Sequence, residues 1–342
     1  MLRDQTLFVI GAGASKEFDF PVGSELATQI AKKLDLRFEG FDQQIGAGDI
    51  GLYEAIRTVS GGRPNELLHA CWLIRDGIEL SYSIDNFIDT HRQDDRVSIC
   101  GKLAIAKCIL DAEKSSKLYL DRNKSDSNPS LKVTGTWISN LIRVMQNGIP
   151  KDEASKFFEN SSFLVFNYDR CIEQYFYHAL QALYGLTESE SAQIVNTMQI
   201  HHPYGSVGAL PWQNNADQKA VSFGARDSAQ TIPHLLPNIK TYTQQTASQT
   251  QQDAVDSLIS KADTIVFLGF SYLAQNLDLM LRGVNARRPR RILGTGIGLS
   301  RADREIVSNA LSVLTTEEDA APIIEELKCN ELLSQYARFL GR

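Results

Sequence analysis

Two polar residues stand where buried strands are expected to end, and their side chains are suited to chemistry. Asn167 follows the apolar run 163–166, and its amide could hold a ribose or a water molecule beyond the strand. His202 lies in the segment HHPYGS, residues 201–206, and a histidine with a near-neutral pKa is a natural general base. An Asx turn at Asn167 and a structural role for His202 are the alternatives, and both stay open from the residues alone.

Tyr204 belongs to the same candidate group. If residues 199–204 are extended, the side chains of His202 and Tyr204 face one side of the strand and that of His201 faces the other. The Gly-Ser pair that follows indicates a turn at the strand end. We therefore expect His202 and Tyr204 to share a strand face.

A glycine turn near the start of the chain could hold an anion. Residues 7–10 are apolar, and Gly11 and Gly13 follow, so backbone N–H groups could approach a ligand closely. Lys16 stands where the dinucleotide fingerprint has its third glycine, and no GK[ST] closes the turn. A plain Rossmann dehydrogenase and a P-loop are therefore not supported. Nucleotide binding and an ordinary strand end both stay open.

A third polar group occurs in SIDNFIDTH, residues 83–91. At helical spacing, Asp85 and Asp89 share one face, and His91 lies on a neighbouring apolar face. A metal site would need a further ligand that the sequence does not offer. Helix capping and surface charge are therefore favoured over a catalytic role.

The apolar patterns predict an α/β fold that positions these groups. Buried strands are expected at 7–10, 163–166, 264–268 and 291–293, with helices between them, which favours a parallel, Rossmann-like sheet. Helical spacing dominates a predicted insertion at about 40–155. A helical C-terminal segment is expected at about 300–342. The whole chain, 1–342, is interpreted as one nucleotide-binding domain carrying this insertion.

Composition excludes several classes of protein. The 342 residues carry a formal net charge of −6 with both signs scattered, so no direct nucleic-acid partner is expected. No apolar run is long enough to span a bilayer, and a cytoplasmic protein without a membrane partner is expected. The five cysteines form no CxxC pair, so we expect them to be reduced and mostly buried rather than part of a zinc ribbon.

Four motifs together resemble the sirtuin family. GAGAS, FNYD, the HPYGS segment and VFLGFS follow one another in the order of that family's blocks, outside the helical insertion. The resemblance implies a Rossmann-like core that binds NAD. The likeness is greatest to sirtuin-like NAD hydrolases of bacterial antiviral defence, whose partner is a HerA-type hexameric ATPase.

The resemblance also implies roles for individual residues. Asn167 would position water and the nicotinamide ribose, with Asp169 ordering the turn. Gly269 and Ser271 would line the adenosine side. The residues that would hold the NAD phosphates are Gly11, Ala12, Gly13, Ala14 and Ser15.

The family's histidine usually stands immediately before the Gly-Ser pair. Here Tyr204 occupies that place and His202 lies two residues earlier. We therefore assign the base to His202, with Tyr204 as its neighbour or as the alternative.

The missing cysteines bear on the implied activity. Deacylating sirtuins carry a CxxC…CxxC zinc module that this chain lacks, so hydrolysis of NAD to nicotinamide and ADP-ribose, without a metal, fits better.

The resemblance further implies a homo-oligomer that depletes NAD during infection, in partnership with the HerA-type ATPase. A zinc-free NAD-dependent deacylase or ADP-ribosyltransferase is one alternative. A non-enzymatic scaffold that binds NAD or ADP-ribose is the other.

Overall fold

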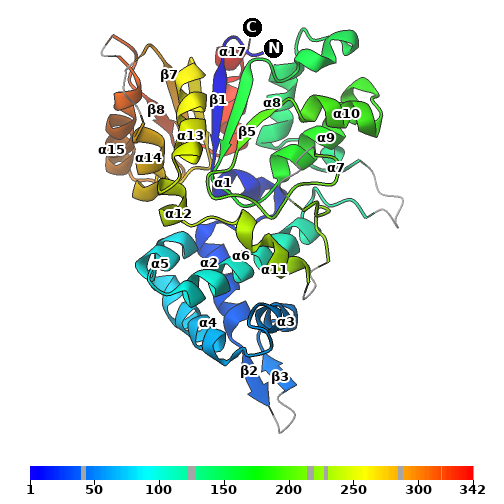
Figure 1. Cartoon of the computed structure of the whole chain (residues 1–342). Helices are drawn as coiled ribbons and strands as arrows, with labels where there is room; N and C mark the ends of the chain where they lie inside the picture. The colour runs from blue at the N-terminus through cyan, green and yellow to red at the C-terminus, as the bar shows by residue number, and fades with distance from the viewer. Residues whose placement is uncertain are drawn as a thin grey trace.

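A six-stranded parallel sheet organises the molecule, with the strand order β5-β4-β1-β6-β7-β8 (Figure 1). The computed structural model describes residues 1–39, 44–121, 128–213, 219–226, 230–283, 288–316 and 318–341. The strands are β1 (Thr6–Ile10), β4 (Ser161–Val165), β5 (Gln199–His201), β6 (Thr264–Leu268), β7 (Arg291–Thr295) and β8 (Ile323–Glu325). The expected α/β class with a Rossmann-like parallel sheet is confirmed.

The central strand β1 explains why the polar residues meet. Ile10 lies opposite Val165 of β4 on one side and opposite Leu268 of β6 on the other. All three strands are parallel and in register, so their carboxyl ends stop at one level. The residues that follow them, beginning with Gly11, Phe166 and Gly269, therefore emerge at the same edge of the sheet.

Alternation along β1 divides the core between the two faces of the sheet. Leu7 and Val9 pack on one side with α13 (Gln249–Lys261), α14 (Ala274–Leu281) and α15 (Arg301–Leu311). Phe8 and Ile10 pack on the other side, whose helices are α8 (Trp137–Gln146), α9 (Cys171–Tyr184), α10 (Glu188–Val195) and α16 (Cys329–Gln335). Two short helices, α7 (Pro129–Lys132) and α17 (Ala337–Leu340), complete this part.

A helical layer lies below the carboxyl edge of the sheet in Figure 1. It contains α2 (Gly23–Leu34), α3 (Ile50–Val59), α4 (Asn65–Gly77), α5 (Ile84–Thr90), α6 (Asp95–Ser115), α11 (Thr231–Leu235), α12 (Tyr242–Thr246) and the hairpin of β2 (Arg37–Glu39) and β3 (Gln44–Ala47). The apolar core of this layer is continuous with the core on the Leu7 face of the sheet. The layer therefore packs beneath the carboxyl ends of the strands.

The helical layer has different limits from the expected insertion at 40–155. Helix α2, which precedes residue 40, packs against α4 and α6, whereas α8 packs against α16 beside the sheet. Helices α11 and α12 come from the connection between β5 and β6 and join the layer through contacts with α3, α5 and α6. By sequence, α8 falls within the expected insertion, but its packing places it beside the sheet and outside the helical layer.

Two further expectations concern the C-terminal segment and the cysteines. The segment expected to be helical also contributes β8, a three-residue edge strand beside β7. Cys71, Cys100, Cys108, Cys171 and Cys329 are free and buried, as expected.

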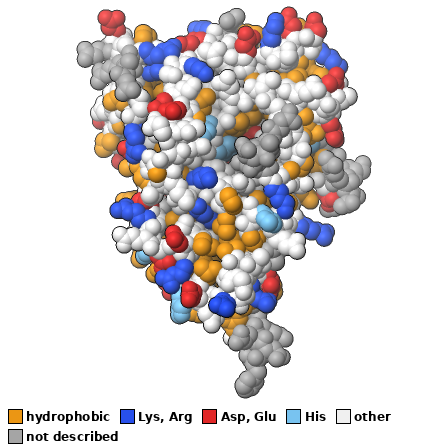
Figure 2. Space-filling view, in the orientation of Figure 1, with side chains coloured by type: hydrophobic (Ala, Val, Ile, Leu, Met, Phe, Trp, Pro, Cys, Tyr) orange, Lys and Arg blue, Asp and Glu red, His pale blue; other side chains and the backbone are white. Residues whose placement is uncertain are grey.

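Among the described helices, none is both long and apolar enough to cross a membrane. On the face drawn in Figure 2, basic and acidic side chains are interspersed over both layers.

Candidate functional site

The turn after β1 packs directly against the turn after β6. A Cβ on Gly11 would lie 2.4 Å from the Gly269 carbonyl oxygen, and one on Gly269 would lie 2.0 Å from the Ala14 nitrogen. Gly269 also has φ +57°, a conformation that side chains disfavour. The Gly13 N–H donates to the Gly269 carbonyl at 3.0 Å. These glycines are therefore required first for contact between two backbone turns.

The N–H groups of the GAGAS turn are partly used by the protein itself. Gly11 N–H donates to Leu268 O at 2.9 Å, and Ala14 N–H donates to Gly11 O at 3.0 Å. Gly11, Ala12 and Gly13 still line the pocket at the sheet edge. Ala14 is buried behind them, and its carbonyl accepts the indole N–H of Trp137 at 2.8 Å.

Ser15, Asn167 and Asp169 form a buried hydrogen-bonded group beside this turn. Asn167 Nδ2 donates to Ser15 Oγ at 3.0 Å, and Ser15 Oγ donates to Asp169 Oδ2 at 2.8 Å. Asp169 Oδ1 in turn accepts the Cys171 N–H at 3.1 Å, at the start of α9. The three side chains are each at most 7% exposed. The β1 and β4 turns are thus locked together, and the Asn167 amide is held in one orientation.

His202 lies directly behind Asn167. Its Nδ1 is 3.1 Å from the Asn167 backbone carbonyl oxygen, and its Nε2 is 3.1 Å from Glu173 Oε1. Burial lowers the pKa of His202, but the Glu173 carboxylate and the Asn167 carbonyl outweigh it, and the pKa stands above its ordinary value. A protonated imidazole donates to both partners and has no lone pair free to accept a proton. The geometry suits a residue that positions the Asn167 turn.

The pairing of His202 and Tyr204 on one strand face is wrong. Strand β5 ends at His201, and residues 202–205 form a turn in which Gly205 N–H donates to His202 O at 2.9 Å. Tyr204 therefore points elsewhere, and its hydroxyl donates to Asn276 Oδ1 at 2.8 Å. Asn276 lines the pocket, whereas Tyr204 is buried behind the lining.

The pocket between the strand ends and the helical layer has a volume of about 490 Å³. The sheet contributes the turns after β1, β4, β6 and β7, including Asn167, Asp169, Gly269, Ser271 and Thr295. Thr295 Oγ1 accepts the Gly269 N–H at 2.8 Å, which joins the β6 and β7 turns. Most sequence-predicted site residues therefore meet at one pocket, and the exceptions, Ala14, Ser15, His202 and Tyr204, lie behind its wall.

Asp85 is a pocket residue, although helix capping and surface charge were expected for its segment from the sequence. It lies in the first turn of α5 and lines the pocket opposite the sheet. The Tyr168 hydroxyl donates a hydrogen bond to Asp85 Oδ1. Burial raises the pKa of Asp85 to about 6, although the bond from Tyr168 opposes the shift. The only sequence signal was its place in SIDNFIDTH, because Tyr168 is distant in the chain.

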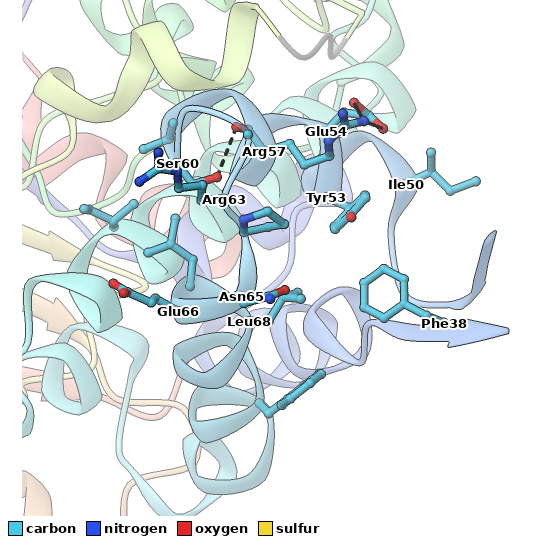
Figure 3. A pocket seen from close by; sticks show the side chains of 16 residues that line it. Phe38, Ile50, Tyr53, Glu54, Arg57, Ser60, Arg63, Asn65, Glu66 and Leu68 are labelled. Atoms are coloured by element: carbon cyan, nitrogen blue, oxygen red, sulfur yellow. Dashed lines mark hydrogen bonds and ion pairs between the residues drawn. The ribbon is translucent and has the colours of Figure 1, made fainter. Parts of the chain in front are cut away.

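A larger hollow of about 1520 Å³ lies far from these groups, between α3, α4 and the β2 strand (Figure 3). Phe38 and Tyr53 meet edge to face there, with ring centroids 5.2 Å apart. Its charged groups include Glu54 and Arg57, which pair with each other at 3.4 Å. The smaller pocket is the better candidate site, because held amide and carboxylate groups converge on it at the carboxyl edge of a parallel sheet.

His202 offers a test of the ion pair behind the pocket. Because the pKa of His202 is raised in the folded state, the stabilisation from its pairing with Glu173 is fully present below the unfolded pKa of about 6.5. That stabilisation is lost as pH rises through the folded pKa. We expect His202→Asn to lower the free energy of unfolding by about 1 to 3 kcal/mol at pH 6. The loss should be smaller at pH 9, as measured by urea denaturation.

The neighbouring His201 is the matched control for that measurement. Burial lowers the pKa of His201 to about 4, with His202 contributing, so its pH dependence has the opposite sign. The stabilisation from neutral His201 is present above the unfolded pKa and is lost as pH falls. His201→Asn should therefore be less costly at pH 6 than at pH 9, and equal pH trends in the two variants would contradict the assignment.

Within the described residues, no group of three or more His, Cys, Asp or Glu side chains could hold a metal ion. No protein-family model matches the chain, and no curated protein shows a significant match to it.

Proposed function

We propose that this protein is an NAD hydrolase that breaks the bond between nicotinamide and ribose and releases nicotinamide and ADP-ribose. The observation that carries the proposal is the held amide of Asn167 at the pocket. Its Nδ2 is bonded to Ser15 Oγ at 3.0 Å, and in the described residues no donor is bonded to its Oδ1. A fixed acceptor of this kind can orient a water molecule against a sugar carbon.

The size and lining of the pocket support a dinucleotide. Its volume of about 490 Å³ lies within the usual range of ligand pockets, roughly 300 to 1,000 Å³. In this proposal the phosphates lie against the turn of Gly11, Ala12 and Gly13, and the adenosine extends towards Gly269 and Ser271. The order of the four sirtuin-like motifs supports the same placement.

The proposal gives His202 a positioning role. With both ring nitrogens engaged, His202 holds the Asn167 backbone carbonyl and so fixes the turn that carries the amide. Asp169 and Ser15 fix the same turn from the other side. Tyr204 acts through Asn276 at the pocket wall.

The sirtuin-like motifs extend the proposal to the biological setting. An enzyme that destroys NAD must be kept silent, so we propose a homo-oligomer controlled by a HerA-type hexameric ATPase, acting on the cytoplasmic NAD pool in defence against phage. No metal is needed, because nicotinamide is a good leaving group and the amide can place the water.

Analysis of the products tests the proposed function. The purified chain, alone and with the ATPase, is incubated with NAD, and the products are measured by mass spectrometry. We expect nicotinamide and free ADP-ribose in equal amounts. ADP-ribose attached to an acceptor, or deacylation of an acyl-lysine peptide, would indicate a transferase or a deacylase instead. Bound NAD that stays intact under both conditions would indicate a scaffold.

A further inference from the structure

The NAD site lacks an obvious base on its sheet side. His202, the residue expected for that task, lies behind the pocket lining and has both nitrogens bonded. Asn167 is an amide and cannot accept a proton at neutral pH. Both carboxylate oxygens of Asp169 are already engaged, because Oδ2 accepts the Ser15 hydroxyl and Oδ1 accepts the Cys171 N–H. The base should therefore be sought on the other wall of the pocket.

That wall is formed by the segment from Tyr82 to Asp85, where the helical layer meets the strand ends. Ser83 caps α5 by accepting the Asn86 N–H at 3.1 Å, which fixes the first turn of the helix. Asp85 lies in that turn and is bonded by the hydroxyl of Tyr168, the residue next to Asn167. The carboxylate is therefore tied to the same strand-end turn as the proposed water-binding amide.

We propose that Asp85 is the base that takes a proton from the attacking water in the NAD site. This inference rests on the proposed hydrolase function and replaces the base role first assigned to His202. A carboxylate with a pKa of about 6 is largely ionised at pH 7 and still basic enough to accept a proton in the transition state.

Attack by water on the sugar is coupled to proton transfer to Asp85. A water oxygen forms a bond to the ribose C1′ while one of its protons passes to Asp85. The bond from C1′ to the pyridinium nitrogen breaks, and its electron pair stays on nicotinamide, which leaves as a neutral molecule. Asp85 then releases its proton to solvent. The net reaction consumes NAD and water and yields nicotinamide, ADP-ribose and one proton.

The groups next to Asp85 do not compete with it for the proton. Tyr168 and Tyr204 have strongly raised pKa values because they are buried near its charge, so both stay protonated. Other ionisable groups around this end of the layer include Tyr82 at the pocket, Asp89 of α5, Tyr242 of α12 and Lys102 of α6. Asp89 is bonded to Thr243, and Lys102 donates to Gln244 at 2.7 Å.

The decisive variant is Asp85→Asn, whose amide oxygen can still accept the Tyr168 hydroxyl but cannot take a proton. We expect kcat for nicotinamide release to fall about 10²- to 10³-fold, with ADP-ribose affinity kept within about threefold. The wild-type rate should fall as pH drops through about 6, and this acid limb should be absent from the residual rate of Asp85→Asn. Asp89→Asn, on the same helix but outside the pocket lining, is the matched control and should keep the wild-type rate and pH profile.

Tyr168→Phe gives a second, independent readout. Because the Tyr168 bond lowers the pKa of Asp85, its loss should move the acid limb of the rate to higher pH. An Asp85→Asn enzyme that keeps its rate, or one that loses ADP-ribose binding together with its rate, would overturn the base role alone. Absence of nicotinamide release from the wild type, with and without the ATPase, would overturn the proposed function and this inference together.

Discussion

Asn167→Ala should lower kcat for nicotinamide release about 10²- to 10³-fold while changing ADP-ribose affinity by less than about threefold. The amide is fixed by Ser15 and by the turn that His202 holds, so its Oδ1 is preorganised before substrate arrives. In the proposed reaction the amide would act mainly on the transition state, because it would orient water rather than hold the nucleotide. Steady-state kinetics with calorimetric titration of ADP-ribose measures both quantities.

Asn160 provides the matched control for this result. It stands at the opposite end of β4, where its Nδ2 donates to Leu2 O at 3.2 Å, far from the pocket lining. Asn160→Ala should leave kcat unchanged. Equal rates in Asn167→Ala and the wild type would remove Asn167 from the mechanism.

Glu113→Gln should lower the free energy of unfolding by about 3 to 5 kcal/mol, because it leaves the Arg170 guanidinium buried without its charge partner. Arg170 Nη2 donates to Glu113 Oε2 at 2.6 Å and Nε donates to Oε1 at 2.9 Å, and both side chains are at most 1% exposed. Burial raises the pKa of Glu113, and the Arg170 charge opposes the shift. Arg170 directly follows Asp169, so the pair also anchors the pocket turn to α6.

The same pair holds a second segment of the chain. Arg170 Nη1 donates to Val221 O at 2.6 Å, and Glu113 Oε2 accepts the Gly224 N–H at 2.9 Å.

Glu305→Gln is the matched control, because Glu305 pairs with Arg301 at 3.1 Å on an exposed helix surface. The Glu305→Gln variant should lose less than about 0.5 kcal/mol of its free energy of unfolding, as measured by urea denaturation. Similar losses in the two variants would contradict the structural importance assigned to the buried pair.

The sheet could be predicted from sequence because its central strands are buried on both faces. β1 and β6 are apolar after a first threonine and β4 ends in an apolar run, so the expected strands 7–10, 163–166 and 264–268 overlap them. β8 was missed because an edge strand of three partly exposed residues has no such run. Parallel strands also predicted that Asn167 and the glycine turns would meet, since carboxyl ends share one edge.

The remaining parts of the site depend on contacts that sequence order hides. Asp85 meets Tyr168 across 83 positions of sequence, and no local pattern distinguishes that contact from helix capping. His202 was expected on an extended strand, but Gly205 has φ +74°, and a Cβ there would lie 1.7 Å from Asn238 O. The chain therefore turns at residues 202–205, which sends His202 towards Glu173 and Tyr204 towards Asn276.

A crystal structure of the protein with ADP-ribose bound would test the central claim most directly. We expect the two phosphates to lie against the turn of Gly11, Ala12 and Gly13, with the distal ribose between Asn167 and Asp85. ADP-ribose bound instead in the hollow between α3 and α4, or a sheet-edge pocket closed by the protein's own side chains, would contradict it.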